Sequence, residues 1–439
     1  MVPIVEPEKV FIFSLTPQAL NNKTMLIRYN FVMFRFIFLF ILTISAGTSL
    51  AKADDTLSAD TTQNFEAFLA DIRIKAIKQG ISKATLDRAF NGLTPDPKVI
   101  QYDRNQAEFT LNFWRYMNSR VSNNRLEEGK VKLEENRPLL ERIYKKYGVQ
   151  PSILVAFWGL ETNYGKHVGK MALVRSLATL SFDLRRREFF TKELLILLKL
   201  IDQEKLPHNA QGSWAGAMGN TQFMPSNVAA YGVDADKNGK LDLWGSKEDI
   251  FHSSTNFLKR IGWHRGERWG REVTVPEDFD FSLASLKIKK TIREWESLGI
   301  KRADGKKNSR SLLSPPEASL ILPMGHKGPA FLVYRNFYAI LRWNRSILYA
   351  LSVGYLSDRL NGQPVLIAES ADEPSLSRDD VFAIQTTLNE LGFNAGKPDG
   401  FSGPKTRNAT RDYQRANNLA IDGYVGYQLL QQLKKQNEY

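Results

Sequence analysis

The feature that most constrains this chain is an apolar segment, residues 151–165, that contains a single charged side chain. It reads Pro-Ser-Ile-Leu-Val-Ala-Phe-Trp-Gly-Leu-Glu-Thr-Asn-Tyr-Gly, and such a segment with proline first and glycine last predicts a short helix. The residues three, four and seven positions before Glu161 are Trp158, Phe157 and Leu154, so we expect its carboxyl group on the buried face. Any fold of this chain must therefore accommodate a buried carboxyl group.

A buried carboxyl group has a chemical consequence. Loss of hydration raises its pKa, so we expect Glu161 to hold a proton near neutral pH. A carboxyl group that is protonated at neutral pH can serve as a general acid. The alternative is a structural glutamate paired with a nearby arginine, because perturbed carboxyl groups also occur in ion pairs.

The N-terminal residues have the composition of a signal peptide rather than of a folded element. Arg28 and Arg35 precede an apolar run at residues 36–45, and Ala51-Lys52-Ala53 supplies a small-residue cleavage site. We therefore expect an upstream extension and signal peptide over residues 1–53 and a periplasmic protein. An uncleaved inner-membrane anchor is the alternative, although the apolar run is short for a membrane span.

The composition limits the classes of partner and site. The 439 residues include no cysteine, which excludes disulfides, thiolate metal sites and a lipid anchor on cysteine. The net charge of +13 favours an anionic partner. No stretch combines a basic stripe with interleaved aromatic residues, so we expect no nucleic acid, and a carboxylate-bearing cell-wall polymer fits better.

Helical and strand patterns divide the chain into domains. Residues 64–79, 126–147, 188–204 and 336–355 are helical in pattern, whereas residues 273–275, 279–281 and 318–323 resemble short strands. We predict a mainly α fold, with a helical catalytic domain at residues 54–362 that carries a small mixed α/β insertion. A polar linker at residues 363–377 precedes a small helical module at residues 378–439, which contains two D-G-aromatic-x-G turns beginning at Asp399 and Asp422.

A second segment, residues 212–226, combines small and functional residues. Its three glycines allow a close approach of the backbone to a ligand, or close packing within the protein. Ser213, Gln222 and Phe223 offer a hydroxyl group, an amide and a stacking surface, the mixture that sugar binding requires.

Several ordered motifs resemble the membrane-bound lytic murein transglycosylase B family. They are Glu161-Thr-Asn-Tyr-Gly165, Leu177-Ala-Thr-Leu-Ser-Phe, Arg185-Arg-Arg-Glu-Phe-Phe190, Gly212–Pro225 and Asn336–Ser346. The C-terminal module resembles the first family of peptidoglycan-binding domains through Leu388–Gly392, Asp399–Thr406 and Tyr413-Gln414. The resemblance implies a lysozyme-like catalytic domain and a three-helix wall-binding module.

The resemblance also implies an activity: cleavage of the β-1,4 bond between N-acetylmuramic acid (MurNAc) and N-acetylglucosamine (GlcNAc) without water. Glu161 would be the sole catalytic residue, first as acid and then as base, and the product would carry a 1,6-anhydro-MurNAc end. A hydrolytic muramidase and an inactive wall-binding scaffold are the alternatives. We expect a monomer that binds peptidoglycan glycan strands, needs no cofactor, and has no enzyme partner that the sequence identifies.

The same resemblance implies the residues that bind the substrate. Ser213 would bond the acetamido group, and Arg185 and Arg186 would suit a carboxylate of the peptide stem or lactyl group. Phe189 and Trp343 stand where the family carries tyrosine, so these two side chains can only stack. The remaining matched positions are Tyr116, Gln222, Phe223, Asn344 and Tyr349.

Residues 234–245 have the oxygen spacing of an EF-hand calcium loop, with glycine at its sixth position. The candidate ligands are Asp234, Asp236, Asn238, Lys240 and Asp242. The twelfth position is Gly245, so the usual bidentate ligand is missing unless Glu248 or Asp249 replaces it. A structural calcium ion and a metal-free turn are both open interpretations.

Overall fold

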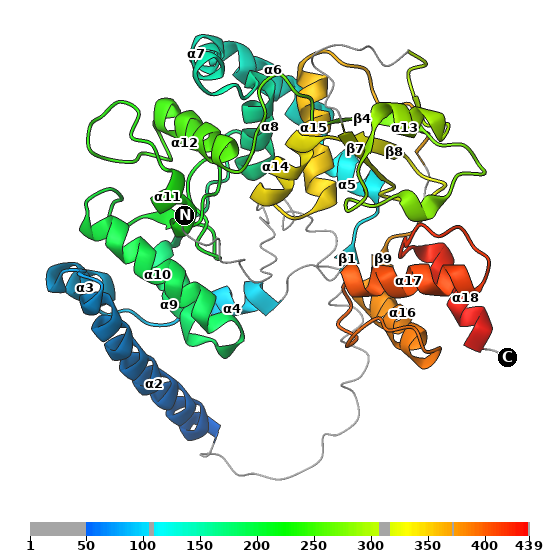
Figure 1. Cartoon of the computed structure of the whole chain (residues 1–439). Helices are drawn as coiled ribbons and strands as arrows, with labels where there is room; N and C mark the ends of the chain where they lie inside the picture. The colour runs from blue at the N-terminus through cyan, green and yellow to red at the C-terminus, as the bar shows by residue number, and fades with distance from the viewer. Residues whose placement is uncertain (1–49, 105–108, 307–316, 371–372, 438–439) are drawn as a thin grey trace. The chain divides into compact units, whose positions relative to one another are not determined.

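The computed structural model (Figure 1) describes residues 50–104, 109–306, 317–370 and 373–437, with only the backbone described for residues 50–63, 109–110 and 437. Nearly all of the predicted signal peptide therefore lies outside the described residues. Contacts between residues separate the chain into two units, and each unit combines distant parts of the sequence. Of the described residues, the first unit takes those within 109–160 and 255–437, and the second takes those within 50–104 and 161–254.

The second unit is helical, and helices α9 and α10 provide its centre. Their buried faces carry leucines such as Leu173, Leu177, Leu194 and Leu198. One short antiparallel pair, β2 with β3, joins residues 171–172 to residues 211–212. The elements of this unit are α2 (Leu50–Lys78), α3 (Lys83–Phe90), α4 (Pro97–Arg104), β2 (Met171–Ala172), α9 (Leu173–Phe182), α10 (Arg187–Asp202), β3 (Gln211–Gly212) and α11 (Pro225–Tyr231).

The first unit begins with further helices. They are α5 (Phe113–Arg120), α6 (Asn123–Glu135), α7 (Arg137–Tyr147), α14 (Arg335–Trp343) and α15 (Ile347–Leu360). The boundary between the units falls within α8 (Pro151–Thr162) and within α12 (Lys247–Arg260). No helix in the described part of the chain is both long and apolar enough to cross a membrane.

A five-stranded sheet forms the mixed insertion of the first unit. The strand order is β5-β7-β8-β4-β6 and every pairing is antiparallel. Trp295 of α13 (Ile292–Ser297) is fully buried against this sheet, and its indole N–H donates to the carbonyl of Ala318. The strands are β4 (Gly270–Thr274), β5 (Lys290–Thr291), β6 (Lys301–Arg302), β7 (Glu317–Ile321) and β8 (Ala330–Val333).

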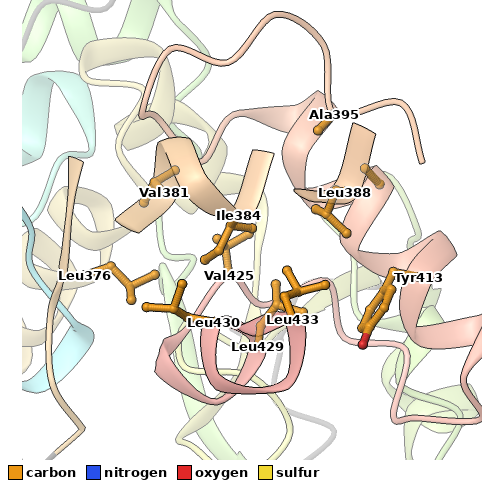
Figure 2. Close-up of a cluster of buried hydrophobic side chains, with 11 residues drawn as sticks. Leu376, Val381, Ile384, Leu388, Ala395, Tyr413, Val425, Leu429, Leu430 and Leu433 are labelled. Carbon is orange, nitrogen blue, oxygen red and sulfur yellow. The ribbon is translucent and has the colours of Figure 1, made fainter. Parts of the chain in front are cut away.

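The C-terminal module is a three-helix unit with its own apolar core. It contains α16 (Arg378–Glu390), α17 (Pro404–Ala416) and α18 (Tyr427–Asn437). Figure 2 shows the core, in which side chains of the three helices and of Leu376, Ala395 and Val425 meet. The predicted fold class is confirmed: the chain is mainly helical, with one mixed insertion and a small helical C-terminal module.

The segment between the catalytic helices and this module is held at both ends. Backbone N–H groups of Ile367 and Ala368 donate to the carboxylate of Glu272. At the other end, β9 (Leu376–Ser377) pairs with β1 (Phe109–Thr110). The predicted linker therefore includes backbone that is bonded to the catalytic part of the same unit.

Three predicted elements were wrong in detail. Residues 126–147 form two helices instead of one, because Pro138 has no N–H for a continuous helix and starts α7 near Asn136. Residues 336–355 also form two helices, because the side chain of Ser346 caps a new helix. Residues 279–281 form no strand, because Asp280 accepts the N–H of Ser282 and caps a 3₁₀ turn at Phe281–Leu283.

Candidate functional site

Glu161 lies in the last turn of α8 and is 2% exposed. The predicted burial of this residue is therefore confirmed. The reason for it differs from the expected single apolar face, because every residue from Ser152 to Thr162 is buried. A helix that is apolar on all sides lies within the core, so Glu161 is enclosed by its surroundings and not by one stripe of side chains.

The turn after Glu161 is fixed by Thr162. Its hydroxyl group donates to the carbonyl of Asn220 over 2.7 Å and accepts the N–H of Gly165 over 3.0 Å. Asn163 and Tyr164 take positive φ values of 50° and 60°, a conformation that costs free energy outside glycine and is common at functional sites. The end of α8 is thereby joined to the segment of residues 212–223.

The glycines of residues 212–219 serve close packing within the protein. A Cβ atom on Gly216 would lie 2.4 Å from Cδ2 of Leu177, and one on Gly219 would lie 2.6 Å from Cβ of Leu243. These distances are too short for a side chain. The packing interpretation of these two glycines is therefore right, and the close approach is to apolar side chains of the same unit.

Ser213 and Gln222 are half-buried residues whose polar groups are oriented by the backbone. The hydroxyl oxygen of Ser213 accepts the N–H of Ala217 over 3.0 Å, so its own hydrogen can be donated to another group. The side-chain amide of Gln222 donates to the carbonyls of Gly219 and Val168, over 2.9 and 3.2 Å, which leaves its oxygen as an acceptor. Together they can offer a donor and an acceptor to a sugar amide.

Phe223 differs from its predicted role. The residue is 1% exposed and belongs to the core. A ring enclosed in this way has no open face on which a sugar can stack. The apolar character of Phe223 is used for packing, a purpose that the motif in the sequence does not distinguish from ligand stacking.

Arg185 and Arg186 lie in the 3₁₀ turn Leu184–Arg186 and share one buried carboxylate. Both guanidinium groups pair with Asp103, which is 4% exposed. Two cations facing one anion leave a positive charge on this surface, and the Arg185 side chain is 55% exposed. Asp103 was missed by sequence reasoning because it lies in α4, far from this motif in the chain.

Phe189 follows this basic turn in α10. Its ring is half-buried and meets the ring of Phe190 edge-on, with centroids 5.0 Å apart. The guanidinium group of Arg186 lies over the other ring, 4.7 Å from the centroid of Phe190. These contacts orient the basic turn at the start of α10.

The other predicted binding residues lie in the first unit. Trp343 is half-buried and packs on two rings, with its centroid 4.4 Å from that of Phe157 and 4.8 Å from that of Phe257. Tyr349 is 5% exposed, and the centroid of its ring lies 6.2 Å from that of Phe157. Phe257 was missed by sequence reasoning, since one aromatic residue in the helical pattern of α12 gives no signal of its own.

Asn344 and Tyr116 complete the residues of the first unit. Asn344 ends α14, and its side-chain oxygen accepts the N–H of Ser346 over 3.1 Å. Tyr116 is a half-buried residue of α5 whose ring lies 5.4 Å from the guanidinium carbon of Arg120. Four predicted residues, Tyr116, Trp343, Asn344 and Tyr349, therefore belong to one unit, while Glu161, Ser213 and Gln222 belong to the other.

The acidic loop after α11 brings together Asp234, Asp236 and Asp249. One carboxylate oxygen from each lies within 4.8 Å of the other two. Asp249 is fully buried, and burial, together with the charges of Asp236 and Asp234, raises its pKa although two backbone N–H groups donate to it. A divalent cation would offset this repulsion, so the donor set fits calcium.

Asp242, another predicted ligand, uses one of its oxygens within the turn. Its Oδ1 accepts the N–H groups of Trp244 and Gly245, over 3.0 and 2.8 Å. This oxygen closes the turn, and the third carboxylate of the cluster comes from Asp249 in α12, one of the two residues that the sequence offers in place of the missing twelfth ligand. Asn238 also bonds within the loop, because its amide donates to Asp236 and its oxygen accepts the N–H of Lys240.

Glu193 is a second buried glutamate that sequence reasoning missed. It lies on the buried face of α10, is 2% exposed, and its Oε2 accepts the N–H of Ser226 over 2.9 Å. Burial raises its pKa, and the bonds from Ser226 only partly oppose this effect. Ser226 stands just after Pro225, so Glu193 fixes the start of α11 directly after the Gln222 segment.

Comparison with protein families gives two matches along the chain. The model described as the transglycosylase SLT domain matches residues 64–358, and a peptidoglycan-binding domain model matches residues 377–433. The membrane-bound lytic murein transglycosylase B of Escherichia coli (strain K12) is 34% identical over 262 residues. The matched region covers 58% of this chain and 67% of that protein.

Solved structures give the same result. SltB3 from Pseudomonas aeruginosa, determined in complex with NAG-anhNAM-pentapeptide, is 41% identical with a TM-score of 0.81, and the match covers 84% of this chain and 99% of that one. The Escherichia coli lytic transglycosylase SLT35 in complex with calcium is 29% identical with a TM-score of 0.56, covering 68% of this chain and 93% of that one. The lysozyme-like catalytic fold is thereby confirmed. The chain belongs to the lytic murein transglycosylase B family, carries a C-terminal peptidoglycan-binding domain, and is a lytic transglycosylase that acts on peptidoglycan glycan strands.

Proposed function

We propose that Glu161 carries out both proton transfers of this reaction. Its protonated carboxyl group gives a proton to the oxygen that leaves C1 of MurNAc as the β-1,4 bond breaks. The resulting carboxylate then removes the proton of the C6 hydroxyl group of the same sugar, whose oxygen bonds to C1. The products are a free GlcNAc 4-hydroxyl end and a 1,6-anhydro-MurNAc end, with no water consumed.

The observation that carries this proposal is the enclosure of Glu161. A carboxyl group that is 2% exposed loses hydration, which favours its protonated form. Its position is fixed, because the next residue, Thr162, bonds both the turn at Gly165 and the carbonyl of Asn220. One fixed carboxyl group with access to both proton states can act first as acid and then as base.

The substrate would be oriented by groups whose hydrogen-bonding capacity remains available. Ser213 would donate its hydroxyl hydrogen to the acetamido carbonyl, and Gln222 would accept from an N–H or O–H group of the sugar. The exposed Arg185, part of a cluster with surplus positive charge, would pair with a stem-peptide carboxylate. Tyr116, Trp343, Asn344 and Tyr349 stay predicted substrate contacts of the first unit.

Calcium is proposed as a structural ion of the acidic loop. Asp234, Asp236 and Asp249 would hold it through carboxylate oxygens, and the ion would neutralise their mutual repulsion. The solved structure of SLT35, which is similar to this chain, contains calcium. The ion would stabilise the loop and would take no part in bond cleavage.

Export to the periplasm is part of the same proposal. Peptidoglycan is an extracytoplasmic polymer, and the basic, apolar and small-residue order of residues 28–53 is typical of a signal peptide. The C-terminal module would hold the enzyme on its insoluble substrate, which raises the local substrate concentration without altering the chemistry.

The test is Glu161→Gln in the full-length protein, incubated with purified sacculi. We expect the release of anhydro-muropeptides to fall at least about 100-fold, since general acid–base catalysis contributes at least that factor. Binding to sacculi should be retained, which separates lost chemistry from lost folding. Comparable turnover in the variant would exclude Glu161 as the acid.

Mass spectrometry of the wild-type products distinguishes the remaining alternatives. A transglycosylase releases products that are lighter by one water than those of a hydrolase. Reducing-end products that contain the extra water would indicate a muramidase. Absence of any released product, with binding intact, would indicate a wall-binding scaffold.

A further inference from the structure

The C-terminal module contains two turns that are built in the same way. In the first, the side-chain oxygen of Gln385 accepts the N–H groups of Asp399 and Gly400, over 2.9 and 2.8 Å. Its amide nitrogen donates to Oδ1 of Asp399 over 2.9 Å, and the same oxygen accepts the N–H of Phe401. The glutamine and the aspartate together fix the backbone that carries the aromatic ring.

The second turn repeats this arrangement. The side-chain oxygen of Gln414 accepts the N–H of Gly423 over 2.8 Å, and its amide donates to Oδ1 of Asp422 over 2.7 Å. That carboxylate also accepts the N–H of Tyr424 over 2.9 Å. The two turns are therefore structural equivalents, as the repeated D-G-aromatic-x-G pattern suggests.

The side chains of the second turn are hydrogen-bonded to other residues of the first unit. Oδ2 of Asp422 accepts the N–H of His326 over 2.8 Å and lies 2.7 Å from Nδ1 of its ring. The hydroxyl group of Tyr424 donates to Glu373 over 2.8 Å, and burial, with the charge of Glu373, raises the pKa of Tyr424. The aspartate and the ring of this turn are thus bonded to other parts of the unit.

The first turn is exposed. Phe401 is 41% exposed, and the guanidinium group of Arg378 lies over its ring at 4.9 Å from the centroid. Nε of Arg378 donates to the carbonyl of Asp399 over 3.1 Å, which holds the cation beside the ring. Phe382, which is 49% exposed, lies one helical turn from Arg378 on the same face of α16. Within the described residues, Arg378 makes no ion pair with a carboxylate.

We propose that Arg378, Phe382 and Phe401, which we call the α16 surface, contact the peptidoglycan strand. An exposed ring held beside a cation suits a sugar that is apolar on one face and lies next to an acidic group. The guanidinium group would pair with a carboxylate of the peptide stem. The inference rests on the proposed wall-binding role of the module. It assigns a different role to each of the two similar turns: the turn at Asp422 bonds to other parts of the first unit, and the turn at Asp399 contacts the wall.

The experiment uses the full-length protein with the Glu161→Gln substitution, so that sacculi are not consumed during binding. Phe401→Ala with Arg378→Gln is compared with Tyr427→Ala plus Arg415→Gln, which removes an exposed ring and an exposed arginine elsewhere in the module. Sedimentation with purified sacculi gives the dissociation constant of each variant. We expect about tenfold weaker binding for the first pair and less than a twofold change for the control pair.

A second measurement distinguishes a loss of wall binding from a loss of catalytic activity. It follows the release of products from short soluble glycan strands by proteins in which Glu161 is intact. The α16 surface variant should retain wild-type release from these soluble strands. Equal sedimentation of both pairs would overturn the α16 surface while leaving wall binding in place. Failure of the parent protein to sediment would overturn this surface together with the tethering role, and normal release from soluble strands would show that the enzyme itself is intact.

Discussion

Two glutamates of this enzyme have buried carboxyl groups, but the sequence indicates the burial of only one of them. Glu161 and Glu193 are each 2% exposed, yet only the first ends an apolar motif that a sequence reader would select. Glu193 lies on an amphipathic helix beside charged neighbours, and nothing in that pattern distinguishes it from a solvated glutamate. The structure identifies it through its bond to Ser226.

Glu193→Gln should change how stability depends on pH. Because burial raises the pKa of Glu193, the folded protein binds this proton more tightly than the unfolded chain. Its contribution to stability is thus present below the ordinary glutamate pKa and is lost as the pH rises through the folded value. Glutamine can accept the same N–H from Ser226 without titrating.

We therefore expect the urea midpoint of Glu193→Gln to rise relative to wild type between pH 4 and pH 8. The relative gain in unfolding free energy should be on the order of 1 kcal/mol per unit of pKa shift. Glu188→Gln, an exposed position at the start of the same helix, is the matched control. Parallel pH curves for wild type and Glu193→Gln would contradict the prediction.

At the scale of elements, the acidic loop shows the limit of a motif with fixed spacing. The calcium template identified Asp234 and Asp236, whose carboxylates do come together. One oxygen of Asp242, the remaining carboxylate of the template, closes the turn, and the third carboxylate of the cluster is Asp249 of the following helix, which the sequence offers together with Glu248 in place of the missing twelfth ligand. The contribution of a neighbouring helix depends on tertiary packing, which the spacing of loop residues does not encode.

Asp249→Asn should weaken calcium binding at least about tenfold, because affinity depends on the number of charged ligands. Asp242→Asn should have a smaller effect, since its remaining oxygen can still accept the N–H groups of Trp244 and Gly245. Isothermal titration calorimetry of the three proteins tests both statements. A larger loss for Asp242→Asn would favour the ligand set of the sequence template.

The calcium affinity of the wild-type protein should also decrease as the pH is lowered. Calcium requires the ionised carboxylate, and the pKa of Asp249 is raised above its ordinary value of 3.8. Protonation of this residue therefore opposes binding at a higher pH than for an ordinary aspartate. Titrations at pH 7 and pH 5 would show the difference.

Helix boundaries were predictable where a cap or a proline marks them. The pattern at residues 188–204 predicts α10 to within two residues, whereas the pattern at residues 126–147 does not reveal the interruption at Asn136 and Pro138. The apolar pattern continues across that interruption, so periodicity alone favours one helix. The local signals at Pro138 and at the capping residue Ser346 determine these helix boundaries more strongly than periodicity does.

At the scale of the whole molecule, the order of segments along the sequence does not predict which segments pack together. The chain reads as a catalytic domain, a linker and a module, yet each of the two units combines segments that are distant in sequence. Such combinations depend on long-range packing. Family resemblance gives the overall fold, but not the use of Asp422 and Glu373 to hold the module.

His326→Ala should loosen the contact between the module and the sheet of the first unit. It removes the ring that lies 2.7 Å from Oδ2 of Asp422 without altering the turn that Gln414 fixes. We expect faster hydrogen exchange at residues 422–424 and in β9, with sacculus binding through the α16 surface unchanged. Exchange that matches the wild type and an exposed His208→Ala control would argue against this contact.

The pairing of β1 with β9 limits how this enzyme can be rearranged by gene fusion. Residues 376–377 complete a ladder with residues 109–110, and Asn112 donates to Ser375 and to the carbonyl of Glu373. A chimaera that exchanged the C-terminal helices at residue 378 would keep this pairing. One joined at residue 362 would lose it, because strand β9 would be replaced. A fusion that brings in a new C-terminal module should therefore keep the pairing only when its boundary lies after residue 377.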